Sequence, residues 1–290
     1  MKAIIFGINS QDGFFLSEIC KANGIEVVGV SRSKGPWVEG SVSDKPFTES
    51  LIKEICPRYV FHLAANSTTR HEALFENNLT INNGTLFIME AVRQYAPDAK
   101  VFITGSGLQF INNGRPILES DEFEAGSAYS MSRIQSVYTA RYYRSLGVAA
   151  YVGYLFHHES PLRKEHHVSK LIAAAAKRIM LGSEEKIPLG DISVLKEWAY
   201  SKDISEGIFT LISQDKVYEA TIGTGITYSI QDWLGACFDI AGKNWRDYVV
   251  LAHDSFKAEY PVLVSNPATM QSIGWKASTS FNQLAQIMMQ

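Results

Sequence analysis

The sequence is poor in cysteine and in net charge. Its three cysteines, Cys20, Cys56 and Cys237, are an odd number with no metal-ligand spacing. This excludes a fully paired disulfide framework and a cysteine-based metal site, so we expect buried free thiols. The formal net charge of −3 gives no reason to expect nucleic acid or a membrane surface as a partner.

Long apolar runs are also missing. A membrane-spanning helix needs roughly 18 or more consecutive apolar residues. The longest candidate, residues 171–181, is interrupted by Lys177 and Arg178. The first apolar run begins at residue 2, which leaves no room for a signal peptide, so we expect a cytoplasmic protein without a membrane segment.

Strand-like and helix-like segments alternate along the chain. Short apolar runs predict strands at 3–6, 26–31, 59–65, 100–104 and 149–156, with a further short strand ending at Ser43-Asp44. Amphipathic stretches predict helices at about 13–23, 47–56, 79–95 and 129–146, the last closed by Gly147. This alternation predicts an α/β fold with a doubly wound parallel sheet. Beyond residue 160 no flexible linker occurs, so we expect a smaller C-terminal lobe interleaved with the first domain.

The opening segment carries a phosphate-binding signal. The apolar run Ala3–Phe6 ends at Gly7, and a helix is expected from Gly13. A helix that starts directly after a strand points its unpaired N–H groups and its positive dipole end at a bound diphosphate. Gly7 and Gly13 keep the outer glycines of the Rossmann dinucleotide fingerprint, while Ser10 replaces the middle one. We therefore predict a Rossmann sheet that binds a dinucleotide at this turn; the alternative is a plain strand–helix turn.

The end of the second predicted strand bears on which dinucleotide binds. NAD-preferring sites place a carboxylate here to hold the ribose 2′-hydroxyl. This chain instead has Arg32 and Lys34, which would attract a 2′-phosphate, so NADP is favoured over NAD. The alternative is a solvated pair of loop charges. Asp44 is expected either to accept a hydrogen bond from adenine or to cap the helix that follows.

Ser106, Tyr129 and Arg133 form the candidate catalytic group. Tyr129 and Arg133 are four residues apart on one predicted helix, so their side chains face the same way. A fixed cation favours a phenolate, and the tyrosine could then exchange a proton with a sugar hydroxyl or ketone while a nicotinamide exchanges a hydride. Ser106, in a small-residue loop after a strand, would hydrogen-bond the same oxygen. The alternative is an ordinary pair of side chains on a helix surface.

Four histidines, His157, His158, His166 and His167, lie within a short stretch. Side chains of adjacent residues point in different directions, and no cysteine or carboxylate spacing completes a tetrahedral ligand set. We therefore expect no metal at this stretch.

Several motifs together resemble those of the extended short-chain dehydrogenase/reductases, and among them GDP-mannose 4,6-dehydratase and related nucleotide-sugar enzymes. The matching segments follow the same order along the whole chain: residues 7–13, 62–65, 84–85, 155–161, 189–191 with Trp198 and Lys202-Asp203, and 273–276. The resemblance implies an NAD(P)-binding Rossmann domain at 1–160, to which some later segments return. It also implies a lobe, mainly 161–290, that binds a nucleoside diphosphate sugar. The helices at about 79–95 and 129–146 would form the interface of a homodimer or homotetramer.

The resemblance also assigns residues to the two ligands. The expected cofactor contacts, besides the catalytic Tyr129 and Arg133, are Gly7, Asn9, Ser10, Gln11, Asp12, Gly13, Arg32, Asp44, Leu63, Ala64, Ala65, Phe156 and His158. The expected substrate contacts are Asn66, Ser67, His157, Glu159, Val168, Lys170, Lys196 and Tyr260.

Some positions depart from the family pattern. Arg133 stands where the family has a lysine; it keeps the positive charge but cannot relay a proton. Leu108 stands where the dehydratases carry the glutamate that supports loss of the 6-hydroxyl. Lys196 and Tyr260 replace two substrate-side arginines, which leaves fewer cations for a diphosphate.

Ketone–alcohol chemistry needs only the hydroxyl, the tyrosine and the nicotinamide. The leading hypothesis is therefore an NADP(H)-dependent oxidoreductase or epimerase that interconverts a ketone and an alcohol at C4 of a nucleotide sugar. One alternative is a 4,6-dehydratase whose acid/base has moved to Glu119 or a histidine. The other is a non-catalytic NADP-binding protein, because Ser10, Arg133, Leu108 and Tyr260 are changes that a retired enzyme could carry.

Overall fold

A seven-stranded sheet forms the centre of the computed structural model, which describes residues 1–252 and 260–290. The strand order is β11-β6-β5-β4-β1-β2-β3, and every neighbouring pair is parallel. Chain order runs outward from β1 to β3 and then, from β4, outward in the other direction, so the predicted doubly wound α/β fold is confirmed. The strands of this sheet are β1 (Lys2–Phe6), β2 (Glu26–Ser31), β3 (Val38–Glu39), β4 (Tyr59–His62), β5 (Lys100–Ser106), β6 (Ala149–Leu155) and β11 (Glu219–Ile222).

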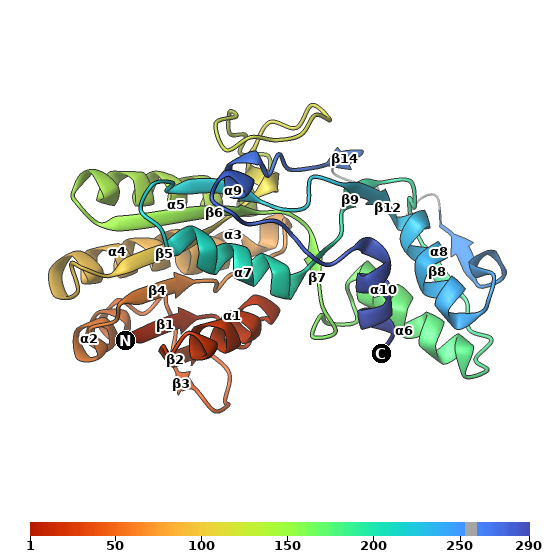
Figure 1. The fold of residues 1–290 in the computed structure, drawn as a ribbon, viewed down its shortest axis with the longest axis horizontal. Coiled ribbons are helices and arrows are strands. Elements are labelled where there is room, and N and C mark those ends of the chain that lie inside the picture. The colour runs from red at the N-terminus through yellow and green to blue at the C-terminus, as the bar shows by residue number, and fades with distance from the viewer. Residues whose placement is uncertain (253–259) are drawn as a thin grey trace.

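Helices cover both faces of the sheet (Figure 1). α1 (Gln11–Ala22) packs against α7 (Ser201–Ile212) on one face. On the other face α4 (Gly84–Tyr95) lies between α2 (Lys45–Ile55) and α5 (Ala128–Ser145). A short helix, α9 (Ala268–Ser272), contacts β11 at the sheet edge.

The alternation of side chains along β1 explains why both faces need a cover. Ala3 and Ile5 point into the apolar cluster shared with α1 and α7. Ile4 and Phe6 point into the cluster shared with α4 and α5. All four are buried, as expected for a strand in the middle of a parallel sheet.

The C-terminal lobe lies beside the sheet rather than on it (Figure 1). It is built on a third apolar cluster from α6 (Val168–Met180), α8 (Ile230–Ala241) and α10 (Phe281–Met289). Short strands pair within the lobe and where it meets the sheet domain: β8 (Ile187–Leu189) with β13 (Val249–Leu251) within it, and β7 (His158–Glu159) with β10 (Ala199–Tyr200) and β9 (Leu195–Glu197) between β12 (Thr227–Ser229) and β14 (Val262–Leu263). In the described part of the chain, every helix is too short or too polar to cross a membrane.

Local differences from the sequence prediction have simple causes. α1 begins at Gln11, two residues earlier than expected, because Ser10 is its N-cap and accepts a hydrogen bond from the Gly13 amide at 3.0 Å. Ser43-Asp44 does not end a strand: β3 is Val38–Glu39, and Asp44 caps α2 by accepting from the Phe47 amide at 3.1 Å.

Three further expectations need correction. Ser106 is the last residue of β5 and not part of a loop, because β6 pairs with β5 as far as Ser106. The helix expected at 79–95 starts earlier and contains a π-helical turn: α3 (Leu74–Asn77) continues through Asn78–Asn83 into α4. Cys56 is exposed at the left-handed C-cap of α2, whereas Cys20 and Cys237 are buried as expected.

A substitution at Gly13 tests how tightly the turn between β1 and α1 is packed. A Cβ there would lie 2.8 Å from the Ile8 Cα and would clash with the Gly7 carbonyl oxygen, both backbone atoms. We expect Gly13→Ala to lower the unfolding free energy by about 1–3 kcal/mol in urea titrations.

Gly235→Ala is the matched control, since Gly235 also lies in a helix, α8, but its Cβ would meet nothing within 4 Å. This variant should gain up to about 1 kcal/mol from helix propensity. Equal stability of the two variants would contradict the packing described for the first turn.

Candidate functional site

The opening turn is held against the end of β4, where the strand order reverses. Gly7 has φ 95°, its amide donates to the Val30 carbonyl at 3.0 Å, and a Cβ on it would lie 2.8 Å from the Ala64 amide nitrogen. The Leu63 amide donates in turn to the Phe6 carbonyl at 2.9 Å. Gly7 and Leu63–Ala65 therefore form one backbone cradle at the carboxyl ends of β1 and β4, which is where open α/β sheets bind their ligands.

The first residues of α1 tie this turn to the segment after β6. Gln11 donates to the His158 carbonyl at 3.3 Å and accepts from the Ser160 hydroxyl at 2.9 Å. The Asp12 carboxylate lies 3.0 Å from Nε2 of His158. The prediction that Gln11, Asp12 and His158 share one site is consistent with these contacts.

The surroundings of His158 favour its protonated form. Its Nδ1 lies 2.6 Å from the Phe156 carbonyl while Nε2 faces Asp12, so both ring nitrogens face acceptors. Burial and the Arg163 charge oppose protonation, but the charge and hydrogen bond of Asp12 outweigh them and raise the pKa of His158.

Two of the candidate catalytic side chains, Tyr129 and Arg133, lie on α5 where it packs on β5, the strand that ends at Ser106. The Arg133 guanidinium carbon lies 5.1 Å from the centre of the Tyr129 ring, and Nη1 donates to the Thr104 carbonyl in β5. Ser106, two residues further along β5, accepts from the Leu108 amide at 3.2 Å. Tyr129, Arg133 and Ser106 are buried to more than nine-tenths, so this is not an exposed helix-surface pair.

Two residues that sequence reasoning missed support this group. Gln109 is fully buried, and its Oε1 accepts from the Ser106 amide at 2.9 Å. A serine followed three residues later by glutamine is a capping-box pattern, which could have revealed the contact. The Thr104 carbonyl has no sequence signal, because every residue carries one.

The residues fit a nicotinamide dinucleotide. Gly7, with its positive φ, lets the turn after β1 pack directly on the Leu63–Ala64 backbone at the carboxyl ends of the strands, the position where such sheets bind dinucleotides. The Arg133 Nε is buried without a hydrogen-bond partner among the described residues. A ribose hydroxyl is an acceptor that would satisfy this donor.

Arg32, the cation predicted to favour NADP over NAD, forms an ion pair that the sequence did not predict. Arg32 donates to Glu76 of α3 at 3.0 Å, and Asn66, expected at the substrate, donates to the same carboxylate at 2.9 Å. These hydrogen bonds, from Asn66 first and Arg32 second, lower the pKa of Glu76. Glu76 therefore balances the Arg32 charge at the end of β2, and no local pattern in the sequence predicts this pairing.

Glu159 and its neighbours form a buried ionic group on the substrate side. Arg163, a residue missed from sequence, donates to Glu159 at 2.9 Å, and Nε2 of His157 lies 2.8 Å from the same carboxylate. Burial alone would raise the pKa of Glu159, but His157 and Arg163 hold it well below its usual range. His157 is also engaged at Nδ1, 2.8 Å from the Glu197 carbonyl.

Lys196 is a buried cation with no counter-charge in contact. Its ammonium lies 4.8 Å from the centre of the Trp198 ring, and it makes no hydrogen bond or ion pair with the described residues. Burial lowers the pKa of Lys196 to about 8, assisted by the Arg163 charge and opposed by Glu159. A buried ammonium in this state is well suited to receive an anion.

The other predicted contacts are dispersed around this centre. Asn9 donates to the Ser33 hydroxyl at 3.1 Å, and Lys170 donates to the Pro161 carbonyl at 3.0 Å. Val168 is the first residue of α6, and Ser67 is exposed in the loop after β4. Tyr260 and Leu108 pack on the same apolar cluster, and Phe156 is buried against Gly107. Their roles toward ligands remain predictions, as does that of Asp44.

The histidine-rich stretch does not gather into a metal site. His157 and His158 reach different carboxylates, and the rings of His166 and His167 pack on each other with centroids 4.3 Å apart. No group of three potential ligands that could hold a metal occurs among the described residues.

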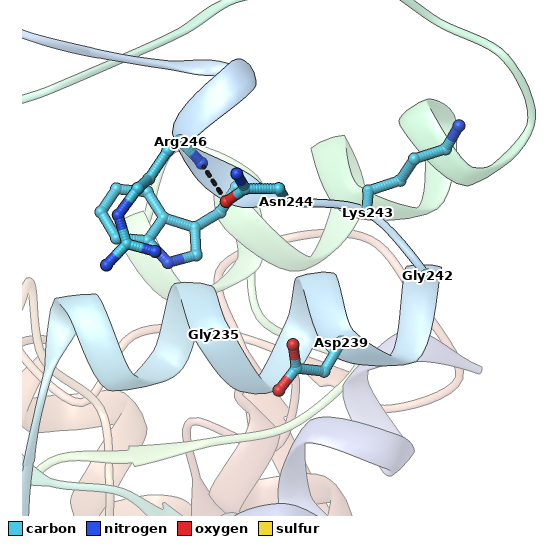
Figure 2. A pocket seen from close by; sticks show the side chains of 7 residues that line it. Gly235, Asp239, Gly242, Lys243, Asn244 and Arg246 are labelled. Atoms are coloured by element: carbon cyan, nitrogen blue, oxygen red, sulfur yellow. Dashed lines mark hydrogen bonds between the residues drawn. The ribbon is translucent and has the colours of Figure 1, made fainter.

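Two pockets lie in or beside the C-terminal lobe. A shallow one of about 520 Å³ runs between α8 and the segment after it, with Gly235 and Asp239 on the helix and Asn244 and Arg246 on that segment (Figure 2). A second of about 230 Å³ includes Trp198, Tyr228 and Phe281 in its wall. None of the residues predicted to bind cofactor or substrate lines either pocket.

The sheet order and the Ser–Tyr–Arg group place this chain among the dinucleotide-binding enzymes with a Rossmann sheet. A model of the GDP-mannose 4,6 dehydratase family matches residues 4–288, and the chain belongs to that family. It is 28% identical to GDP-mannose 4,6 dehydratase 2 of Arabidopsis thaliana over 320 residues, covering 99% of this chain and 85% of the plant protein. The expected family and the expectation of an enzyme are thereby confirmed.

Solved structures share the fold at low identity. MoeE5 in complex with UDP-glucose and NAD superposes with a TM-score of 0.87 at 19% identity, covering 100% of this chain and 97% of that one. RMD from Pseudomonas aeruginosa, complexed with NADPH, gives a TM-score of 0.85 at 18% identity, covering 99% and 96%.

The Asp12–His158 pair generates a pH prediction. A histidine whose pKa is raised on folding contributes stability that is complete below its unfolded pKa of about 6.5 and is lost as pH rises through the folded value. We therefore expect Asp12→Asn to destabilise the protein more at about pH 6 than at about pH 9 in urea titrations.

Asp98→Asn is the control, because Asp98 is exposed and its side chain makes no ion pair or hydrogen bond with the described residues. A stability loss for Asp12→Asn that stays constant between the two pH values would contradict the raised pKa of His158.

Proposed function

We propose that the protein uses a nicotinamide dinucleotide to interconvert a ketone and an alcohol at C4 of a nucleotide sugar. The observation that carries this proposal is the pairing of Tyr129 with Arg133 on α5, anchored to β5 through the Thr104 carbonyl and adjacent to Ser106. Ser106 ends β5, the strand next to β4, and α5 packs on β5. The group therefore lies toward the same carboxyl edge of the sheet as the Gly7 cradle.

Each side chain has a definite task in this reaction. A bound nicotinamide would supply the hydride acceptor or donor. Because the Ser106 oxygen already accepts from the Leu108 amide, its hydrogen is available to donate to the sugar oxygen. The Tyr129 oxygen makes no hydrogen bond with the described residues. It gives a proton to the sugar oxygen as a phenol during reduction and takes that proton back as a phenolate during oxidation. Arg133 supplies fixed positive charge beneath the ring.

A nucleotide sugar is proposed as substrate because of family membership and the charge on its side of the site. The family is described as GDP-mannose 4,6 dehydratase, and the fold neighbour MoeE5 binds UDP-glucose. Lys196 is a buried ammonium without a counter-charge in contact, and a diphosphate would compensate it.

NADP(H) is the proposed form of the cofactor, with NAD as the alternative. Arg32 would have to leave Glu76 to bind a 2′-phosphate. Both side chains of this ion pair are more than a third exposed, so their separation costs little. A doubly charged phosphate would be the stronger partner for the guanidinium.

A 4,6-dehydratase is the second candidate, favoured by the family match over residues 4–288. Dehydration needs an acid/base beside the sugar, and Leu108 cannot provide it. Of the predicted substitutes, Glu119 accepts a hydrogen bond from Thr269 of α9, and His157 is engaged at both ring nitrogens. These contacts favour the ketone–alcohol reaction.

We further propose that copies of the chain associate through the helices on the α4–α5 side. Large apolar side chains are exposed along α3, the π-helical turn, α4 and α5, although the helices pack well on their inner faces. They are Phe75, Leu79, Leu86, Tyr138 and Tyr142. A homodimer or homotetramer would cover this face.

Tyr129→Phe tests the proposed chemistry. Removal of one hydroxyl should lower hydride transfer by about 10²–10⁴-fold, while cofactor affinity changes little because the ring and Arg133 remain. The measurements are nicotinamide absorbance at 340 nm with a panel of nucleotide sugars and cofactor titration by fluorescence.

Tyr138→Phe, on the exposed side of the same helix, is the control and should keep full turnover. Unchanged turnover of Tyr129→Phe would overturn the assignment. The product mass separates the two candidates, since only dehydration removes one water.

Phe75→Glu combined with Tyr142→Glu tests the assembly. A charge on each of these exposed rings, 79% and 61% accessible, should shift the mass measured by light scattering from the oligomer to the monomer. Leu181→Glu, a control at the 84% exposed C-cap of α6, should leave the mass unchanged. A monomeric parent protein, or variants that still associate, would contradict the proposed interface.

A further inference from the structure

The 230 Å³ pocket lies at the junction of the two lobes, apart from the cofactor cradle. From the sheet domain it is lined by the segment after β11, including Gly223 and Thr224, and by Pro267 and Gln271 at α9. From the lobe it is lined by Trp198 and Tyr228, and the connection 276–281 between the two completes the wall. Its volume suits a ligand of one ring with a small substituent.

Aromatic side chains form one part of the wall. The rings of Tyr228 and Phe281 stack with centroids 3.9 Å apart and an interplanar angle of 15°. Trp198 meets Phe281 edge-on at 6.1 Å, and its indole N–H donates to the Tyr228 carbonyl at 2.9 Å. Such walls favour a flat, unsaturated ligand over a puckered one.

The connection 276–281 is held in place by a buried carboxylate. Asp203, itself buried, accepts from the amides of Ser278 and Thr279 at 2.9 and 2.7 Å and from both of their hydroxyls. These backbone donors are therefore satisfied, and the pocket exists before a ligand binds.

Lys276 sets the charge that the pocket prefers. It is the one charged side chain among the lining residues, and it has no ion pair or hydrogen bond with the described part of the chain. The Gln271 amide, also on the wall, is a neutral donor for the same carboxylate.

Trp198 also connects the pocket with the substrate side. The Lys196 ammonium lies over its ring, and His157 meets the ring edge-on with centroids 5.0 Å apart. Trp198 would therefore touch both a ligand in the pocket and the two residues, Lys196 and His157, that are expected to contact substrate.

From this arrangement we infer that the pocket is a second ligand site, selective for a small planar organic anion. The carboxylate pairs with Lys276, and the ring packs among Trp198, Tyr228 and Phe281. The inference does not depend on the proposed reaction, because it concerns binding alone.

Ligand-observed NMR titration of the full-length protein with benzoate tests the site. Benzoate should bind saturably in the millimolar range, as expected for a ligand of so few atoms. Benzamide, the neutral compound of the same shape, and cyclohexanecarboxylate, the non-planar anion, should each bind about fivefold more weakly.

Two variants localise the binding. Lys276→Met keeps most of the side-chain length, so it should weaken benzoate about fivefold while leaving benzamide unchanged. Gln271→Trp, at an exposed lining position, should fill the pocket and abolish saturable binding of all three compounds. Lys216→Met, an exposed lysine outside the pocket, should change nothing.

The outcome is decisive in either direction. Benzoate that fails to saturate, binds no better than benzamide, or binds equally to the parent protein and to Gln271→Trp would overturn the inference. Cofactor titration of each variant, expected to match the parent protein, shows that a lost benzoate signal does not reflect misfolding.

Discussion

The close backbone approach between Gly7 and Ala64 is the constraint on which the rest of the site depends. It joins the two strands at which the sheet reverses its order, with no room for a single additional carbon. β5 pairs with β4 on its other side and ends at Ser106. The contact between Gly7 and Ala64 therefore also helps to set the distance between the first turn and Ser106. Tyr129 and Arg133 are placed by the packing of α5 on β5. Their distance from the cradle is therefore set by the pairing of three adjacent strands, β5, β4 and β1.

Prediction from sequence succeeds where the determining forces are local. Burial on both faces gives β1 a continuous apolar run, and the four-residue spacing of Tyr129 and Arg133 places them together on one helix turn. Ser10 shows the limit of motif matching. Serine in place of the middle glycine weakens the match to the Rossmann fingerprint, yet serine is a better N-cap than glycine, and α1 begins at Gln11 instead of the expected Gly13.

Prediction fails where a contact joins residues far apart in the chain. Glu76 reaches Arg32 across 44 positions, and neither flanking sequence indicates the pairing. Arg133 keeps its charge inside the protein by donating to the carbonyl of Thr104, an acceptor that any residue would present. The hydrogen bond that Glu119 accepts from Thr269 joins residues 150 positions apart, and the role of Glu119 as a substitute acid/base stays a prediction.

The hydrogen bonds of Gln11 and Asp12 have a mechanical consequence. They attach the first turn of α1 to His158 and Ser160, directly where the chain crosses toward the C-terminal lobe. The lobe cannot slide away from the sheet at this crossing without breaking them. The spacing between the first turn of α1 and the start of the lobe is therefore set by side-chain contacts as well as by the chain itself.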